Sequence, residues 1–383
     1  MKETKFKDTE LGKIPEEWEV CNLGSIGVPL MCKRIMKWQT NETAGIPFYK
    51  IGTFGKQADA FIAPDIWRYM ITHFNYPKKG DILISAAGTI GRTVVFDGQP
   101  SYFQDSNIVW IDNDEEKVLN PYLEYAYTKI AWSTDASTIS RLYNNNLKSA
   151  LILFPHDKAE QQRIASALSD ADALVAELDA LIEKKRAIMA GTMQELLTGK
   201  RRLQGFSESW VERTIEDFAK ITTGASNTQD QAPFGIFPFY IRSASVMKSN
   251  RFLYDCEGVI TIGDGQIGKV FHYVNGKFDL HQRCYLIYDF YDVDAKFFYY
   301  IFSAFFYERA IALSAKATVD SVRRDMIAKM KVDLPSLAEQ HAIATILSDM
   351  DAEIAELEAK RDKYKEVRQG MMQQLLTGKI RLI

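Results

Sequence analysis

One segment of this sequence occurs twice. Residues 160–203 align with residues 339–382 after a shift of 179 positions, and 24 of the 44 aligned residues are identical. Both copies end in the pentapeptide LLTGK, at 196–200 and 375–379. A duplication of this quality predicts two structurally equivalent halves, so a fold without an internal repeat is excluded.

The duplicated segment has the pattern of a long helix. Apolar residues recur at alternating steps of four and three, which is the heptad pattern of helices packed side by side. A proline precedes each copy (Pro155 and Pro335), and Gly199 and Gly378 follow where a helix would end. Helices of roughly 35–40 residues would be about 50–60 Å long. The seam residues are Ile164, Leu168, Ala171, Val175, Leu178 and Ile182 in the first copy, and Ile343, Leu347, Met350, Ile354 and Leu357 in the second.

Two features depart from a uniform coiled coil. Gly191 and Gly370 lie inside the copies and predict a kink or a break in each helix. The seam of the second copy is interrupted by Arg361, Tyr364 and Arg368, which indicates that this part of the helix faces a partner instead of the other helix.

A fainter repeat extends outside the helices. IPFYKIG (46–52) resembles FPFYIRS (237–243), residues 80–96 resemble 257–273, and residues 138–155 resemble 318–335. Trp18 and Trp210 mark the start of each half. Short β-branched and aromatic runs predict strands in both halves, and helices are expected to open at Asn120-Pro121, continuing through Trp132, and after Asp294.

We therefore predict an α+β protein with pseudo-twofold symmetry, in which two similar mixed α/β domains are joined by two long helices that pair as a coiled coil. The strands and helices do not alternate in the manner of βαβ units. The expected division is into residues 1–155, a first domain; 156–203, a first long helix; 204–334, a second domain; and 335–383, a second long helix.

The composition limits the classes of function. The net charge is −3, with 47 basic and 50 acidic residues, which argues against a protein that binds nucleic acid unaided. The four cysteines and five histidines do not have the spacings of a disulfide framework or a metal site. The N-terminus lacks an apolar export signal, and the longest apolar run, 297–307, is too short to span a bilayer. We expect a cytoplasmic protein that binds no membrane and no metal.

Two glycine motifs suggest nucleotide binding but do not fit it. Arg201 and Ile380 follow the LLTGK lysines where a Walker motif needs Ser or Thr. GDGQIG (263–268) matches the dinucleotide fingerprint, but the residues that follow predict a strand and an Asn-Gly hairpin turn instead of the required helix. Two interpretations remain: a tight turn that needs glycine at positive φ, or a turn whose amides approach a phosphate beside Arg92 or Lys269.

The order of the parts, the Pro…Glu-Gln…Ile-Ala sequences at 155–165 and 335–344, and the paired LLTGK sequences resemble the specificity (S) subunit of Type I restriction–modification systems. The resemblance spans the whole chain. It implies that each domain is a target recognition domain for one half of a split DNA sequence, and that an antiparallel coiled coil sets the spacing between the halves.

The resemblance also implies the partners. Such a subunit is not an enzyme. It recruits two methyltransferase subunits, which carry S-adenosylmethionine and modify adenine, and the complex can then join two restriction subunits that use ATP and Mg²⁺. The low net charge fits a protein whose partners neutralise much of the double-stranded DNA backbone. No cofactor is expected in this chain.

Candidate DNA contacts are the polar and basic side chains beside the repeated turns, because Arg and Lys pair with guanine and Asn and Gln with adenine. In the first domain they are Arg34, Lys50, Thr89, Arg92, Gln104, Ser106, Asn107, Arg141, Asn144 and Asn145. In the second they are Arg242, Ser243, Gln266, Lys269, His281, Gln282, Arg283, Lys316, Arg323 and Arg324. Leu196, Leu197, Leu375 and Leu376 are candidate partner contacts, with burial against a neighbouring domain as the alternative.

Three other functions stay open at this point. The chain could be the specificity subunit of a related bifunctional restriction–methylation enzyme, which has the same architecture but a different partner. It could be a stand-alone DNA-binding or scaffold protein, in which case the isolated chain would bind DNA tightly. A nucleotide-dependent enzyme is the weakest alternative, because it depends on GDGQIG alone.

Overall fold

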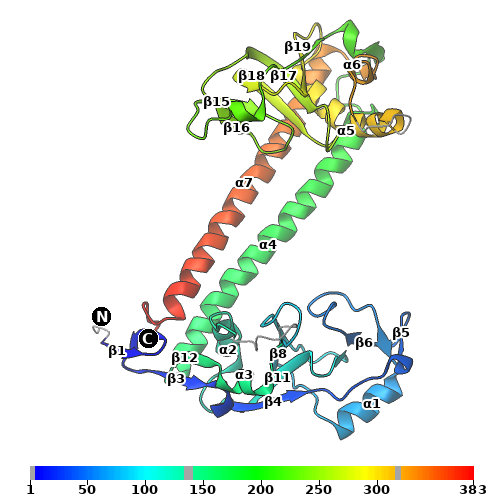
Figure 1. The fold of residues 1–383 in the computed structure, drawn as a ribbon. Coiled ribbons are helices and arrows are strands. Elements are labelled where there is room, and N and C mark those ends of the chain that lie inside the picture. The colour runs from blue at the N-terminus through cyan, green and yellow to red at the C-terminus, as the bar shows by residue number, and fades with distance from the viewer. Residues whose placement is uncertain (1–4, 133–140, 315–320) are drawn as a thin grey trace. The chain divides into compact units, whose positions relative to one another are not determined.

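The computed structural model describes residues 5–132, 141–314 and 321–383. It divides into two compact units, one formed by residues 1–177 with 361–383 and the other by residues 178–360. Each unit holds one globular domain together with a part of both long helices, whose course is drawn in Figure 1.

In its described residues, the first domain is built from short strands and three short α-helices. Its best-formed sheet has the order β4-β11-β8-β9, and a second sheet has the order β10-β6-β7-β5. The elements are β1 (Phe6–Thr9), β2 (Gly12–Pro15), β3 (Trp18–Asn22), β4 (Gly27–Met31), β5 (Thr40–Asn41), β6 (Ile46–Tyr49), β7 (Phe61–Ile62), α1 (Pro64–His73), β8 (Ile82–Ser85), β9 (Thr93–Val95), β10 (Tyr102–Phe103), β11 (Ile108–Asn113), α2 (Asn120–Tyr127), α3 (Asn144–Ser149) and β12 (Leu151–Pro155).

The second domain has one six-stranded sheet in the order β14-β19-β17-β18-β15-β16. Its elements are β13 (Val211–Thr214), β14 (Lys220–Thr223), β15 (Phe237–Tyr240), β16 (Met247–Ser249), β17 (Tyr254–Ile262), β18 (Phe271–Leu280), β19 (Cys284–Tyr288), α5 (Ala295–Ser314), α6 (Arg324–Ala328) and β20 (Lys331–Leu334). In both domains a strand near the beginning pairs antiparallel with the last strand: β3 pairs with β12, and β13 pairs with β20.

The two domains follow the same strand order. The long strand β18 corresponds to β9 and β10 together, because its beginning pairs antiparallel with β17 and its end pairs parallel with β15. In the first domain the segment from Asp97 to Ser101 interrupts this strand, and the single sheet becomes two. The first domain also contains α1, which has no counterpart in the short connection from β16 to β17.

The structure contains the strands and helices that the sequence predicted, but two details of the prediction are wrong. The helix that opens at Asn120 ends at Tyr127 instead of continuing to Trp132. The Asn-Gly turn predicted at Asn275-Gly276 is wrong, since β18 passes through both residues. Gly276 has a φ of +105° within the strand, which Gly tolerates without a turn.

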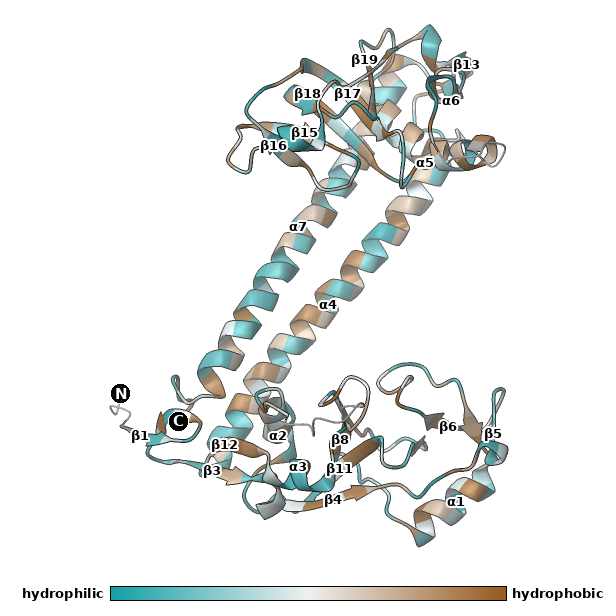
Figure 2. Ribbon diagram, in the orientation of Figure 1, coloured by the Kyte–Doolittle hydropathy of each residue, from teal (hydrophilic) through white to brown (hydrophobic). Residues whose placement is uncertain are grey.

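The long helices are α4 (Lys158–Leu196) and α7 (Leu337–Leu375). Both continue through Gly191 and Gly370, so neither glycine breaks its helix. Within the second unit Ile182 of α4 shares a core with Ile354 of α7, and Arg186 forms an ion pair with Glu358. Figure 2 shows apolar and polar residues interspersed along both helices, as a one-sided seam requires.

The polar interruption of the seam has a partner within the first unit. Arg368 of α7 forms an ion pair with Asp172 of α4, so this position faces the other helix, contrary to the expectation for the interrupted seam. Asp172 also accepts a hydrogen bond from the Tyr125 hydroxyl at 2.9 Å, and in the second unit Asp351 accepts one from Tyr300 at 2.6 Å. The repeated aspartate therefore fixes each domain's helix to a long helix.

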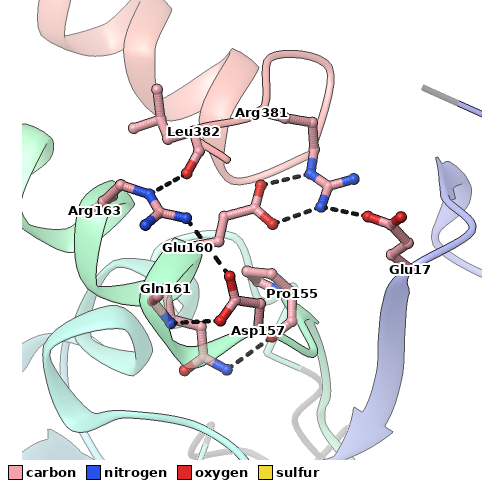
Figure 3. A network of polar contacts seen from close by, with 9 residues as sticks. Glu17, Pro155, Asp157, Glu160, Gln161, Arg163, Arg381 and Leu382 are labelled. Carbon is pink, nitrogen blue, oxygen red and sulfur yellow. Dashed lines mark hydrogen bonds and ion pairs between the residues drawn. The ribbon is translucent and has the colours of Figure 1, made fainter. Parts of the chain in front are cut away.

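The repeated Glu-Gln sequence connects the start of one long helix to the segment that follows the other (Figure 3). Glu160, at the start of α4, is fully buried and accepts two hydrogen bonds from Arg381, which follows the end of α7. Arg381 also lies over the Trp18 ring and contacts Glu17 at 3.0 Å. The neighbouring Gln161 donates to the Pro155 carbonyl at 2.8 Å and accepts from the Leu119 N–H at 2.8 Å.

The second unit repeats this arrangement. Glu339 is fully buried at the start of α7 and accepts hydrogen bonds from Nε and Nη2 of Arg202, both at 2.7 Å. Arg202 lies over Trp210, as Arg381 lies over Trp18. Because Arg202 and Arg381 follow LLTGK, the pentapeptide has a structural role: it ends one long helix and returns the chain to the first turn of the other.

We expect Arg381→Ala to lower the free energy of unfolding of the first unit by about 3–5 kcal/mol, because it leaves the buried Glu160 carboxylate without a counter-charge. Urea denaturation followed by tryptophan fluorescence measures this change. Lys78→Ala is the matched control in the same unit; it removes an exposed pair with Asp112 and should cost at most about 1 kcal/mol. Equal effects of the two substitutions would contradict this assignment.

Gly199 and Gly378 provide a second, internally controlled comparison. Both end a long helix with φ near +67°, so Ala should cost about 1–2 kcal/mol at either site. A Cβ at Gly378 would lie 2.5 Å from Pro15 Cγ, whereas one at Gly199 meets nothing closer than 3.5 Å. Thermal unfolding should therefore show a larger loss for Gly378→Ala, and a ranking in the opposite order would refute this account.

Candidate nucleic-acid interface

Three segments meet in the same way in both domains. In the first domain the Ala86 N–H, just after β8, donates to the Asn107 carbonyl at 2.8 Å, and the Ala86 carbonyl accepts from the Leu142 N–H at 2.9 Å. In the second domain Gly263, just after β17, takes the place of Ala86: its N–H donates to Arg283 at 2.8 Å and its carbonyl accepts from Val322 at 2.8 Å. We call this arrangement the three-segment junction.

The middle segment of each junction is a short loop that begins in the same way. The Gln104 N–H donates to the Tyr49 carbonyl at 2.9 Å, and the His281 N–H donates to the Tyr240 carbonyl at 3.0 Å. The loop comprises residues 104–107 in the first domain and 281–283 in the second. The backbone scaffold is thus shared, whereas the side chains differ: the loop reads QDSN in the first domain and HQR in the second.

In the first domain the junction borders a cavity of about 810 Å³, and most of the residues that line it are polar. Six predicted DNA contacts line it: Arg34, Lys50, Gln104, Ser106, Asn107 and Arg141. A smaller hollow of about 430 Å³ shares Ser106 and Arg141 and adds Asn144 and Asn145. The structure therefore brings together eight of the ten residues predicted in this domain.

Ion pairs and hydrogen bonds order this cavity. Arg34 Nε lies 2.8 Å from Asp105 Oδ2; the arginine side chain is 65% exposed and the aspartate 17%. Lys50 pairs with Asp59 at 2.9 Å. Arg141 donates to the Ser106 carbonyl at 2.7 Å and to Asn107 Oδ1 at 3.1 Å, which ties the third segment to the loop. The cations are held at the surface of the cavity by carboxylates and carbonyls.

The loop itself has a constrained backbone. Ser106 has a φ of +55°, in the left-handed region that residues other than glycine rarely adopt. Such positions persist where the surrounding structure enforces them and are concentrated at functional sites. The Gln104 side-chain oxygen accepts a hydrogen bond from the Ile51 N–H at 2.9 Å, so this oxygen stabilises the loop.

In the second domain the junction carries a cluster of two arginines and one aspartate. Asp264 Oδ2 lies 2.6 Å from Arg283 Nη1 and 3.1 Å from Arg242 Nη1. Burial alone would raise the pKa of Asp264, but the hydrogen bonds from Arg283 and Arg242 outweigh it and lower the pKa below the ordinary value. Asp264 is therefore ionised at neutral pH.

His281 is not a surface contact in this structure, contrary to the prediction. The side chain is buried, and its Nδ1 accepts from the Arg283 N–H at 3.1 Å. Burial lowers the pKa of His281, and the charge of Arg242 lowers it further, so the ring is neutral at pH 7. The ring thus fixes the backbone that carries Arg283, while Gln282 is exposed and its amide donates to Asn227.

The repeated glycine motifs form tight turns in both domains. Gly91 and Gly268 both have positive φ, as the tight-turn interpretation requires. GDGQIG connects β17 to β18, so the strand-to-helix context of a dinucleotide site is absent at this described loop. Arg92 donates to the Ile51 carbonyl at 3.4 Å and lies over Phe54, and Lys269 lies over Tyr307, so both cations have neighbours within the chain.

The remaining predicted residues fall into three groups. Thr89, Gln266, Arg323 and Arg324 are exposed, and Ser243 donates to the Ser245 carbonyl at 3.0 Å. Lys316 lies outside the described residues. The four leucines predicted as partner contacts are buried in the hydrophobic cores of their own units: Leu196, Leu197, Leu375 and Leu376. The structure therefore agrees with the alternative interpretation, burial against the neighbouring domain.

Sequence reasoning missed Asp105, Asp264 and Trp38. Both aspartates pair with arginines that are distant in the sequence, which no local pattern reveals. Trp38 is 81% exposed, and its neighbour Lys37 lines the first-domain cavity. The free cysteines Cys32 and Cys284 are buried, and burial raises the pKa of each thiol to about 12.

Two absences hold for the described part of the chain. There, the structure contains no group of three or more His, Cys, Asp or Glu side chains that could hold a metal ion. None of the described helices combines the length and the apolar character that crossing a membrane would require.

Comparison with known proteins identifies the family. Residues 15–185 and 207–366 match the model of the Type I restriction modification DNA specificity domain. The chain belongs to this family. The two matches correspond to the two halves that the internal repeat predicts, and they confirm the resemblance noted from the sequence.

Individual relatives agree with this assignment. A Haemophilus influenzae protein, provisionally described as a type I restriction enzyme specificity subunit, is 53% identical over 174 residues, which cover 45% of this chain and 45% of that protein. The chain thus spans about half the length of this relative. The provisionally described MjaX specificity subunit of Methanocaldococcus jannaschii is 25% identical over 429 residues, covering 100% of this chain and 98% of that protein.

A solved structure shares the fold. The S subunit of a type I restriction–modification system from M. genitalium aligns with a TM-score of 0.71 over 97% of this chain and 98% of that chain, at 16% identity. This similarity confirms the predicted fold class, two mixed α/β domains with long helices.

Proposed function

We propose that this chain is the subunit of a type I restriction–modification complex that recognises a bipartite DNA sequence, with one half-site bound by each domain. The observation that carries the proposal is the three-segment junction. Two domains build the same backbone junction and place different donors on it, Arg34 and Arg141 in one, Arg242 and Arg283 in the other. A common scaffold with different donors suits two different half-sites.

The chemistry of each junction fits the major groove of DNA. Arginine donates two hydrogen bonds to guanine, and the amides of Asn107, Asn144 and Asn145 suit adenine. A sequence-reading surface needs fixed side chains, and the ion pairs of Arg34, Arg242 and Arg283 provide that order. The net charge of −3 supplies little general attraction to phosphates, so partners must contribute it.

The partners follow from the family. We infer that two methyltransferase subunits bind this chain in the cytoplasm, carry S-adenosylmethionine and modify adenine, and that restriction subunits using ATP and Mg²⁺ can join them. This chain then supplies recognition and no catalytic group.

Methylation mapping tests the proposal. The chain is expressed with type I methyltransferase subunits in a host without DNA adenine methylation, and modified adenines are located across the genome. We expect a split motif with a fixed spacer. Exchange of residues 204–334 for the same segment of another specificity subunit should change one half-motif only. A stable complex that yields no split motif would refute the proposal, and tight sequence-specific binding by the isolated chain would favour the stand-alone alternative.

We also expect the long helices to set the spacer. Four residues added at matched positions of α4 and α7 lengthen each by about 6 Å, which is close to two base pairs of about 3.4 Å. The mapped spacer should grow by up to two base pairs with both half-motifs unchanged. Seven added residues keep the heptad phase and serve as a control, with an expected increase of about three base pairs. An unchanged spacer in a folded variant would show that the helices do not set it.

A further inference from the structure

Asp264 lies between two arginines that come from two other parts of the second domain. Arg242 follows β15, and Arg283 belongs to the loop between β18 and β19. The Asp264 side chain is 20% exposed, whereas Arg242 is 44% and Arg283 is 61% exposed. The carboxylate is thus recessed, and the two guanidinium groups extend from it toward the solvent.

Folding stability accounts for only part of this arrangement. The two arginines stabilise the ionised Asp264 carboxylate, but solvent screens the charges of Arg242 and Arg283, which are 44% and 61% exposed. A carboxylate on a surface that approaches phosphates also weakens DNA binding by repulsion. A negative charge at this position therefore needs another explanation.

The backbone around Asp264 is fixed from both sides. The preceding Gly263 forms two hydrogen bonds of the three-segment junction, and a Cβ on it would lie 2.7 Å from the Arg283 carbonyl. Asp264 itself forms a β-bridge with Ser321. The buried His281 ring holds the Arg283 N–H. Both the carboxylate and the backbone of one arginine are therefore held at defined positions.

Each arginine keeps a free donor edge. Among the described residues, the hydrogen bonds formed by the Arg242 and Arg283 guanidinium groups all go to Asp264, and they use Nη1. The Nε and Nη2 donors of each group remain for an external acceptor. Two parallel N–H donors match the O6 and N7 acceptors of guanine in the major groove.

We propose that Asp264 is a positioning residue that orients Arg242 and Arg283 for guanine recognition in the half-site bound by the second domain. This inference rests on the proposed function. It adds which base is recognised, guanine, and which side chains recognise it, Arg242 and Arg283. This Asp264–arginine cluster occurs in the second domain only, because the repeat aligns Ala87 of the first domain with Asp264.

The test uses the complete complex with its methyltransferase subunits and combines methylation mapping with DNA affinity. Arg283→Ala and Arg242→Ala should each relax the preference for guanine at one position of the second half-motif by about 5- to 150-fold, with the first half-motif unchanged. Arg283→Lys keeps the charge but loses the two-donor fork, so it should keep DNA affinity and still relax that position.

Asp264→Asn gives the decisive result. It keeps the shape and removes one negative charge, so total DNA affinity should stay equal or rise while the guanine preference at the same positions falls. Asp289→Asn is the matched control, because it removes the carboxylate of an exposed pair with Lys220 in the same domain and should leave the motif intact.

Several results would overturn the inference. They are a second half-motif without guanine, an unchanged motif in Asp264→Asn, or a uniform loss of affinity in that variant with the sequence preference preserved. Equal thermal midpoints of Asp264→Asn and Asp289→Asn exclude misfolding as the cause. A wild-type complex that yields no split motif refutes the proposed function itself, and the inference with it.

Discussion

The buried Glu–Arg pairs at the ends of the long helices determine how the chain is organised. Glu160 and Glu339 are fully buried at the first turn of a helix, and each binds an arginine that follows the end of the other helix. A buried carboxylate without a counter-charge is strongly unfavourable, so each helix start requires the opposite helix end. This requirement explains why Glu-Gln at one end and LLTGK-x-Arg at the other are repeated together.

This organisation separates the parts that must stay the same from the parts that can change. The helix ends, the aspartates that bind Tyr125 and Tyr300, and the three-segment junctions are matched between the two halves. The side chains on the junctions are not matched. In the proposed function, a rigid scaffold would hold the variable donors within the narrow geometry that base recognition needs, because a guanidinium that moves freely does not discriminate among bases.

The sequence predicted the features that local pattern determines. The heptad seam located both long helices, and prolines and glycines marked their ends, because helix periodicity and capping depend on neighbouring residues. The repeat also predicted two similar domains. It did not predict α1, which is an insertion in one half only, or the early end of α2 at Tyr127.

The candidate site was predicted in part, and for physical reasons. Polar residues beside the repeated turns were predicted as DNA contacts, and eight of them line adjoining cavities in the first domain. Asp105 was missed because its partner Arg34 is 71 positions away in the sequence. His281 was expected to be a surface contact, but its burial depends on strand packing that the letters around it do not specify.

The pairing of β3 with β12 and of β13 with β20 has a consequence for evolution. Since β3 pairs with β12 and β13 with β20, the chain enters and leaves each domain at neighbouring points, and everything between them is a closed insertion. The second insertion lies between the two long helices, whose repeated segments are identical at 24 of 44 positions. Genetic exchange between such segments would replace one whole domain and join it to an intact helix, so the half-sites can change independently while the framework is inherited unaltered.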